Sequence, residues 1–238
     1  MRPRLRRLRP EPEHPFPELA AIDARDSAML TRLLAWSLAP DSCCIDIGAH
    51  TGNVLTEMRR VAPRGRHIAY EPLPHLADHL RAGFPDVDVR CAALSDHAGE
   101  ASFARVRAAE AWSGLLFRPL PGNAEPDLEE ITVRLEVLDD ALPPGFVPAM
   151  VKIDVEGAEE QVVRGALRTL REHKPLVVFE HGLGSANAYG TEPDDLHRLL
   201  VEEAGLRIFD LDGGGPYDRE EFHRAFYAFE RVNWVAHA

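Results

Sequence analysis

The sequence predicts an α/β fold with a doubly wound, mostly parallel sheet and helices on both faces. Two observations support this prediction. Short apolar runs typical of buried strands alternate along the chain with amphipathic helical segments, an order that favours parallel strands joined by helices. Acidic residues directly follow several of these runs, and ligands of such sheets bind at the carboxyl ends of the strands.

The predicted elements begin with a helix over residues 23–39 that ends at Pro40. Further helices are expected at about 52–61, 74–83, 158–172 and 193–204. Strands are expected at about 43–47, 67–71, 86–94, 100–106, 131–137, 149–154, 175–180, 206–211 and 226–236. Two irregular stretches, 107–130 and 183–192, are long enough to suggest a function, and we expect them to line a substrate pocket.

Composition limits the partners that the chain is expected to have. The 238 residues suffice for one domain over 23–238, preceded by an Arg- and Pro-rich extension over 1–22. That extension is either a flexible segment or a basic arm that contacts an anionic partner. The net charge of −12 disfavours a nucleic-acid partner and an anionic membrane surface. Three cysteines, all in predicted strands, suit a reducing cytoplasmic location.

The segment over 43–53, CCIDIGAHTGN, joins a buried strand to a glycine turn. Asp46 precedes a G-x-x-x-G pattern formed by Gly48 and Gly52, and Glu71 ends the next apolar run. Strand, turn, helix, strand and acid are the order of a nucleoside-binding unit whose acid accepts hydrogen bonds from a ribose. A dinucleotide pyrophosphate favours G-x-G-x-x-G, but His50 occupies the second glycine position here. A carboxylate ahead of the turn suits an ammonium and a sulfonium, so the pattern predicts S-adenosylmethionine as cofactor.

Each of these acids has a second, structural interpretation. Asp46 either accepts from the cofactor's amino group or fixes the glycine turn by accepting from its N–H groups. Glu71 could instead be a solvated acid at the end of a strand. We expect Glu159 and Glu160 to lie on the surface of a helix.

Several segments together resemble the FkbM-type family of S-adenosylmethionine-dependent methyltransferases. They are IDIGAHTGN, AYEPLP, AALSDHAGE, LDD, VKIDVEGAEEQVVRGA and VVFEHG, and they span about 42–182. The resemblance implies a Rossmann-like class I methyltransferase fold, with a seven-stranded sheet whose last strand is antiparallel. It also implies O-methylation of a hydroxyl group on a sugar, a polyketide or another specialised metabolite.

The same resemblance assigns further residues to the cofactor. The turn residues His50, Thr51 and Asn53 are expected to contact it, and Ser95 and Asp96 are expected near its adenine. Family members often have Asn where this chain has His50.

Methyl transfer to a hydroxyl oxygen needs a base or a metal ion to activate that hydroxyl. Asp154, Glu156, Glu180 and His181 end two predicted strands, so we expect them to converge beside the transferred methyl group. One of them could act as the base. Alternatively, Asp154, Glu156 and Glu180 could hold Mg²⁺.

Two other functions stay open on the sequence alone. The chain could be a nicotinamide-dependent Rossmann oxidoreductase, or a cofactor-binding module of the same fold without turnover. The sequence does not specify the acceptor or the oligomeric state.

Overall fold

A computed structural model describes residues 17–107, 109–117, 127–182, 184–228 and 231–238. Residues 1–16 of the expected extension therefore lie outside the described residues. Helix α1 (Pro17–Ser37) begins within the rest of it, ahead of the boundary that the sequence predicts at residue 23.

The main sheet has seven strands in the order β3-β2-β1-β7-β8-β10-β9. Strands β1, β2, β3, β7 and β8 pair in parallel, whereas β10 runs antiparallel to both β8 and β9. The predicted fold class is therefore confirmed, including the antiparallel last strand. The strands are β1 (Cys43–Ile47), β2 (His67–Tyr70), β3 (Asp88–Arg90), β7 (Pro148–Ile153), β8 (Leu176–Glu180), β9 (Arg207–Asp210) and β10 (Asn233–His237).

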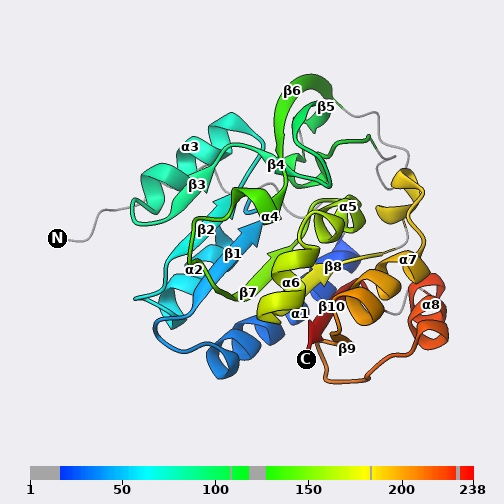
Figure 1. Cartoon of the computed structure of the whole chain (residues 1–238). Helices are drawn as coiled ribbons and strands as arrows, with labels where there is room; N and C mark the ends of the chain where they lie inside the picture. Colours follow the sequence, from blue (N-terminus) through cyan, green and yellow to red (C-terminus); the bar gives the residue numbers. More distant parts are fainter. Residues whose placement is uncertain (1–16, 108, 118–126, 183, 229–230) are drawn as a thin grey trace.

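Helices cover both faces of this sheet (Figure 1). Helices α1, α2 (Asn53–Val61) and α3 (Pro74–Gly83) pack on one face around Leu34, Leu55 and Leu80. The opposite face is covered by α4 (Leu138–Ala141), α5 (Glu159–Arg164), α6 (Leu167–His173), α7 (Pro193–His197), the π-helical turn η4 (Arg198–Glu203) and α8 (Arg219–Tyr227). Burial of apolar side chains on both faces is the main driving force for this arrangement.

A second, three-stranded sheet has the order β4-β6-β5 and lies at the top of Figure 1. Its strands are β4 (Ala93–Leu94), β5 (Gly99–Val106) and β6 (Leu128–Glu136). The strand predicted over 86–94 is thus wrong as a single element, since the chain leaves the main sheet after β3 and enters the small sheet at β4. Phe103, Val133 and Leu135 of the small sheet pack against Leu73 and Leu76 at the start of α3.

The strand predicted over 226–236 is also wrong in its first part, which belongs to α8. Helix α8 begins with a capping box that the sequence analysis missed: Asp218 accepts from the Glu221 N–H at 2.8 Å, and Glu221 accepts from the Asp218 N–H at 3.1 Å. These hydrogen bonds satisfy two N–H groups that would otherwise lack a partner at the helix terminus, so they favour a helix that begins here.

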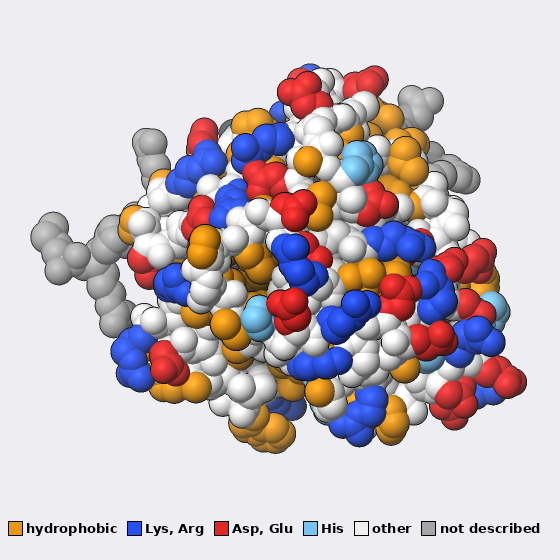
Figure 2. Space-filling view, viewed as in Figure 1, with side chains coloured by type: hydrophobic (Ala, Val, Ile, Leu, Met, Phe, Trp, Pro, Cys, Tyr) orange, Lys and Arg blue, Asp and Glu red, His pale blue; other side chains and the backbone are white. Residues whose placement is uncertain are grey.

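The surface mixes charges of both signs, as the interspersed acidic and basic side chains in Figure 2 show. Among the described helices, none is both long and apolar enough to cross a membrane.

Candidate cofactor and methyl-transfer site

A cavity of about 260 Å³ opens at the carboxyl ends of β1, β2 and β7. Strand order reverses beside β1, because β2 lies on one side and β7 on the other. Ligands of doubly wound sheets bind at such a switch point. Among the described residues, four carboxyl groups and one amino group line the cavity, those of Glu71, Glu110, Asp154, Glu156 and Lys152.

The glycine turn after β1 forms one wall of this cavity. Gly48 has a positive φ of 76°, and a Cβ atom there would lie 1.8 Å from the carbonyl oxygen of Asp154. Only glycine therefore fits at this crossing of the two chain segments. His50 has a φ of 48°, in the left-handed region that Asn, Asp and His enter most readily among residues with a side chain. Asn, the residue that the family resemblance implies at this position, meets the same conformational demand as His50.

The side chain of Lys152, on β7, binds this glycine turn. Its Nζ donates to the Gly48 carbonyl at 2.9 Å and forms ion pairs with Asp154 at 3.2 Å and Asp46 at 3.5 Å. Burial opposes the charge on the ammonium, but the carboxylates of Asp154 and Asp46 outweigh burial and raise the Lys152 pKa. The sequence analysis did not assign Lys152 to the site, although its alternation with Asp154 was a usable signal.

Asp46 lies behind the turn and does not line the cavity. Its carboxylate is fully buried, and burial raises its pKa while Lys152 lowers it. This placement gives Asp46 a role that was not predicted, as the counter-charge that keeps Lys152 in position. The two predicted roles, contact with the cofactor's amino group and acceptance from the N–H groups of the turn, stay predictions.

Glu71 lines the cavity and joins two loops through its carboxylate. It accepts from the His50 N–H at 2.8 Å and from the Leu73 N–H at 2.9 Å. Burial raises the pKa of Glu71 to about 7, despite these two hydrogen bonds, which lower it. The carboxylate fixes the glycine turn relative to the loop after β2 and still faces the cavity.

This geometry agrees with the family comparison. The family model described as the methyltransferase FkbM domain matches residues 46–208. The chain belongs to this family. No curated protein matches the sequence.

The fold of this FkbM domain is shared by a solved structure at low sequence identity. The FkbM methyltransferase from Methylobacillus flagellatus KT is 15% identical with a TM-score of 0.51, covering 91% of this chain and 60% of its own. This chain thus spans three fifths of that protein. The plantazolicin methyltransferase BpumL, in complex with a pentazolic desmethylPZN analog and SAH, is 8% identical with a TM-score of 0.48, covering 93% of this chain and 84% of its own.

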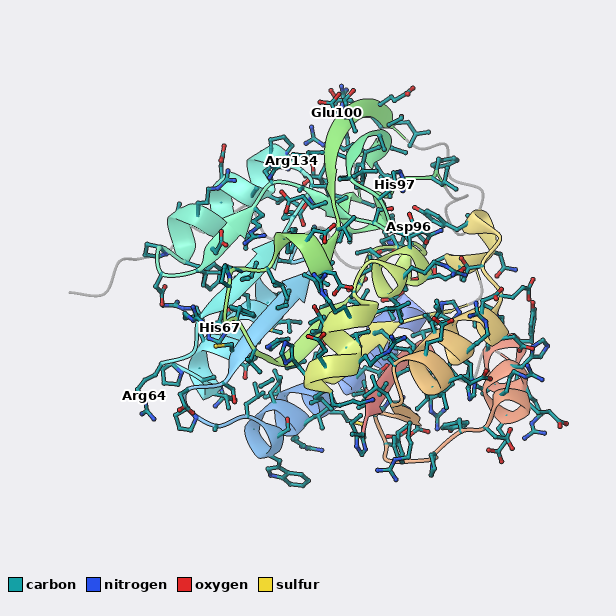
Figure 3. All side chains as sticks on the ribbon, in the orientation of Figure 1. Arg64, His67, Asp96, His97, Glu100 and Arg134 are labelled. Carbon is teal, nitrogen blue, oxygen red and sulfur yellow. The ribbon has the colours of Figure 1, made fainter. Side chains whose placement is uncertain are left out.

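The FkbM domain places some predicted cofactor residues at the cavity and others away from it. Thr51 and Asn53 line it, whereas Gly52 does not and instead precedes α2. Ser95 and Asp96 do not line it either. The Ser95 hydroxyl and the His97 ring bond the Asp96 carboxylate at 3.3 and 2.7 Å, and Figure 3 shows Asp96 and His97 between the small sheet and α5.

The cavity lining in that region comes from the residues just before Ser95. They are Ala92, Ala93 and Leu94. Their side chains are apolar, so they suit contact with the flat face of a base rather than a hydrogen bond from a carboxylate. The adenine contact of Ser95 and Asp96 therefore stays a prediction that this geometry does not favour.

The four predicted catalytic residues are not brought together. Asp154 and Glu156 line the cavity, whereas Glu180 and His181 do not. Glu180 lies close enough to Lys152 to raise its pKa. The His181 ring is fully buried and packs against Phe226 of α8, with ring centroids 4.9 Å apart.

Contacts with the segment that enters β10 fix the backbone of His181, which directly follows Glu180, the last residue of β8. The His181 N–H donates to the Val232 carbonyl at 2.7 Å, and the Trp234 indole donates to the His181 carbonyl at 3.0 Å.

Glu159 is buried, contrary to the expected helix surface. It is 1% exposed, and its carboxylate accepts from the Gly157 N–H at 2.9 Å and from the Val155 N–H at 3.3 Å. Glu159 therefore fixes the turn that carries Glu156. Glu160 pairs with Arg164 one helical turn later.

The metal alternative is not supported by the side-chain arrangement. Within the parts of the chain that the structure describes, no three His, Cys, Asp or Glu side chains gather as metal ligands. Of the three predicted ligands, Asp154 and Glu156 line the cavity and Glu180 does not.

A segment predicted as a loop contributes the remaining wall. The short 3-10 helix η1 (Glu110–Trp112) and the residues after it supply Glu110, Ser113 and Leu115 to the lining. Glu110 bonds the His75 ring at 2.9 Å and the Arg105 guanidinium at 2.9 Å. Residues 108 and 118–126 of the predicted loop lie outside the described residues.

Replacement of Lys152 by methionine is expected to destabilise the fold strongly. The substitution leaves the Asp46 carboxylate buried without its counter-charge, a loss of about 3–5 kcal/mol in unfolding free energy. Urea denaturation of Lys152→Met, Asp46→Asn and the double variant measures it. The double variant should be more stable than Lys152→Met, and equal stability of the two would contradict the ion-pair role.

Glu71 should make stability depend on pH. Its folded pKa of about 7 exceeds the ordinary value of 4.5, so the folded state keeps the proton to higher pH than the unfolded chain. The unfolding free energy should fall as pH rises from 4.5 to 7, by about 3 kcal/mol in total. Denaturation of wild type and Glu71→Gln at each pH isolates this term, and parallel profiles of the two proteins would refute it.

Proposed function

We propose that this chain binds S-adenosylmethionine in the switch-point cavity and transfers its methyl group to a hydroxyl oxygen of a small molecule. The observation that carries the proposal is the charge of the lining. Four carboxylates face the cavity, and the only lining ammonium, within the described residues, is already paired with Asp46 and Asp154. Such a lining attracts a ligand with a sulfonium and an ammonium group.

The same lining opposes the nicotinamide alternative. A pyrophosphate would bring two negative charges to a wall that presents Glu71, Asp154 and Glu156. His50, where the dinucleotide pattern has a glycine, also lines the cavity.

Glu71 and the glycine turn are the residues that would hold the cofactor. Glu71 uses one lone pair on each oxygen for a backbone N–H, and each carboxylate oxygen can accept again, so the ribose hydroxyls can still bond it. When bound, the cofactor supplies an electrophilic methyl group on a positively charged sulfur.

Glu156 is the residue that we assign as the base. Asp154 already forms an ion pair with Lys152 at 3.2 Å, and Glu180 and His181 lie outside the lining. Glu156 lines the cavity with a φ of 60°, an unusual value for a residue with a side chain. Such conformations concentrate at functional sites, where the surrounding structure maintains them.

Glu156 would accept the proton of a hydroxyl acceptor in contact with it, while the bound cofactor would supply the methyl group and keep the electron pair of its broken carbon–sulfur bond. Positioning the two reacting atoms in line supplies a large part of the rate. The Glu156 carboxylate therefore needs only to lie within hydrogen-bond distance of the acceptor hydroxyl.

Calorimetric titration with S-adenosylmethionine and with NAD tests the cofactor. We expect binding of the first alone, and an affinity about 10- to 100-fold weaker in Glu71→Ala, since a charge-assisted hydrogen bond contributes about 1.5–3 kcal/mol. Glu100→Ala is the matched control, because Glu100 is exposed on the small sheet (Figure 3) and has the same charge. Equal affinity of Glu71→Ala and wild type would exclude the ribose contact.

Labelled methyl transfer to a cell extract tests turnover and the acceptor class. Product should survive digestion of the extract with ribonuclease and protease if the acceptor is a small molecule. Loss of product after either digestion would assign the acceptor to RNA or to protein instead, and no product at all would favour the non-catalytic module.

Glu156→Gln is expected to reduce turnover by about 100-fold or more, since general-base catalysis contributes about 10²–10⁴-fold. Cofactor affinity should stay within about threefold of wild type. Glu180→Gln and His181→Ala serve as comparisons, because both residues were predicted to be catalytic and lie outside the cavity lining. A full rate in Glu156→Gln with cofactor bound would show that the base lies elsewhere.

A further inference from the structure

Tyr189 joins the two irregular segments of the predicted substrate pocket. Among the described residues, only the 107–130 segment supplies cavity lining, and none of 184–192 does. Tyr189 ends the short 3-10 helix η3 (Ala186–Tyr189), and its hydroxyl oxygen accepts from the Leu116 N–H at 2.9 Å. The two residues are 73 positions apart in the sequence. One segment carries Ser113 and Leu115 of the cavity lining, so this hydrogen bond ties a cavity wall to η3.

The ring of Tyr189 lies against the turn that carries Glu156. A Cβ atom on Gly157 would lie 2.7 Å from Tyr189 Cδ2 and 2.4 Å from the Ser185 carbonyl oxygen. Gly157 also has a φ of 112°. The turn after β7 therefore lacks a side chain at the place where η3 and the Tyr189 ring pack on it.

The wall and the turn approach each other at the same tyrosine. A Cβ atom on Gly114 would lie 3.1 Å from the Tyr189 hydroxyl and 3.7 Å from Glu156 Cβ. Gly114 is itself held to β5 by reciprocal backbone hydrogen bonds with Ala104, at 2.8 and 3.1 Å. Tyr189 thus contacts the 113–116 wall through its hydroxyl and the turn that carries Glu156 through its ring.

We propose that Tyr189 is a positioning residue that sets the distance between the 113–116 wall and Glu156, and so fixes a hydroxyl acceptor against its base. This inference rests on the proposed function, because it uses Glu156 as the base. Tyr189 is not assigned a proton-transfer step. Its hydroxyl accepts from the wall, and its ring supports the turn.

The structure offers a matched pair of variants. Tyr189→Phe removes the hydroxyl and keeps the ring over Gly157. Tyr227→Phe removes a hydroxyl that bonds Glu192 at 2.7 Å on the exposed side of α8, away from the cavity lining. Each substitution deletes one oxygen atom and, with it, the hydrogen bond named above.

Hydrogen exchange of peptides that cover 113–117 is the first measurement. Tyr189→Phe should accelerate exchange at the Leu116 amide by about tenfold or more, since this N–H loses its partner. Tyr227→Phe should leave that exchange unchanged, and both proteins should melt within about 2 °C of wild type.

Calorimetry with S-adenosylhomocysteine and kinetics with the acceptor recovered from the extract separate positioning from a structural role. Tyr189→Phe should raise the KM for the acceptor about fivefold or more, while its affinity for S-adenosylhomocysteine stays within about twofold of wild type. A loss of thermal stability together with cofactor affinity would instead show a merely structural residue and overturn the proposal.

Unchanged exchange at Leu116 in Tyr189→Phe would overturn it as well, whatever the kinetics show. Failure of the proposed function has a different signature, because wild type would then bind no S-adenosylhomocysteine. The exchange measurement needs neither cofactor nor turnover and keeps its meaning in that case.

Discussion

The buried ammonium of Lys152 is the interaction on which the site depends. It lies between β1 and β7, where it bonds the Gly48 carbonyl and the carboxylates of Asp46 and Asp154. A buried charge is tolerated only when partners compensate it. These three groups come from β1, from the turn that follows β1 and from the residue directly after β7. The glycine turn, the end of β7 and the strand order are thus fixed together.

This arrangement determines the electrostatic character of the cavity. Because Lys152 is already paired, the remaining lining carboxylates are not neutralised by it, although Arg105 partly neutralises Glu110. Glu71 shows the effect of such surroundings, since burial holds its pKa near 7. A cationic ligand would lower that pKa and favour the ionised carboxylate, so binding and ionisation would reinforce each other.

The opposite side of the cavity depends on packing rather than on charge. Glu159 accepts the backbone N–H groups of the turn after β7, and the ring of Tyr189 lies on Gly157 in the same turn. Glu156 is thereby held at a positive φ beside Gly114. In the FkbM domain described here, one wall is formed by the glycine turn and Glu71, and the other holds the Glu156 carboxylate in a defined orientation.

Patterns along the chain were sufficient for the architecture. The alternation of apolar runs predicted the parallel sheet, because burial on both faces leaves a local signature in each strand. The turn with Gly48 and the acid at Glu71 also followed from local order, since both belong to one strand–turn–helix–strand unit. Helix α8 was missed, although the spacing of Asp218 and Glu221 is a local signal that was available.

The sequence by itself determined the fold class, the family resemblance and the edge of the sheet at which the site lies. Tertiary structure alone decided which strand-end residues face the cavity. Glu156 reaches it, whereas His181 packs under α8 and Glu159 bonds its own turn. The direction of a side chain at a strand end depends on the turn that follows and on the elements packed against it, and no local pattern encodes contacts such as Lys152 with Gly48 or Tyr189 with Leu116.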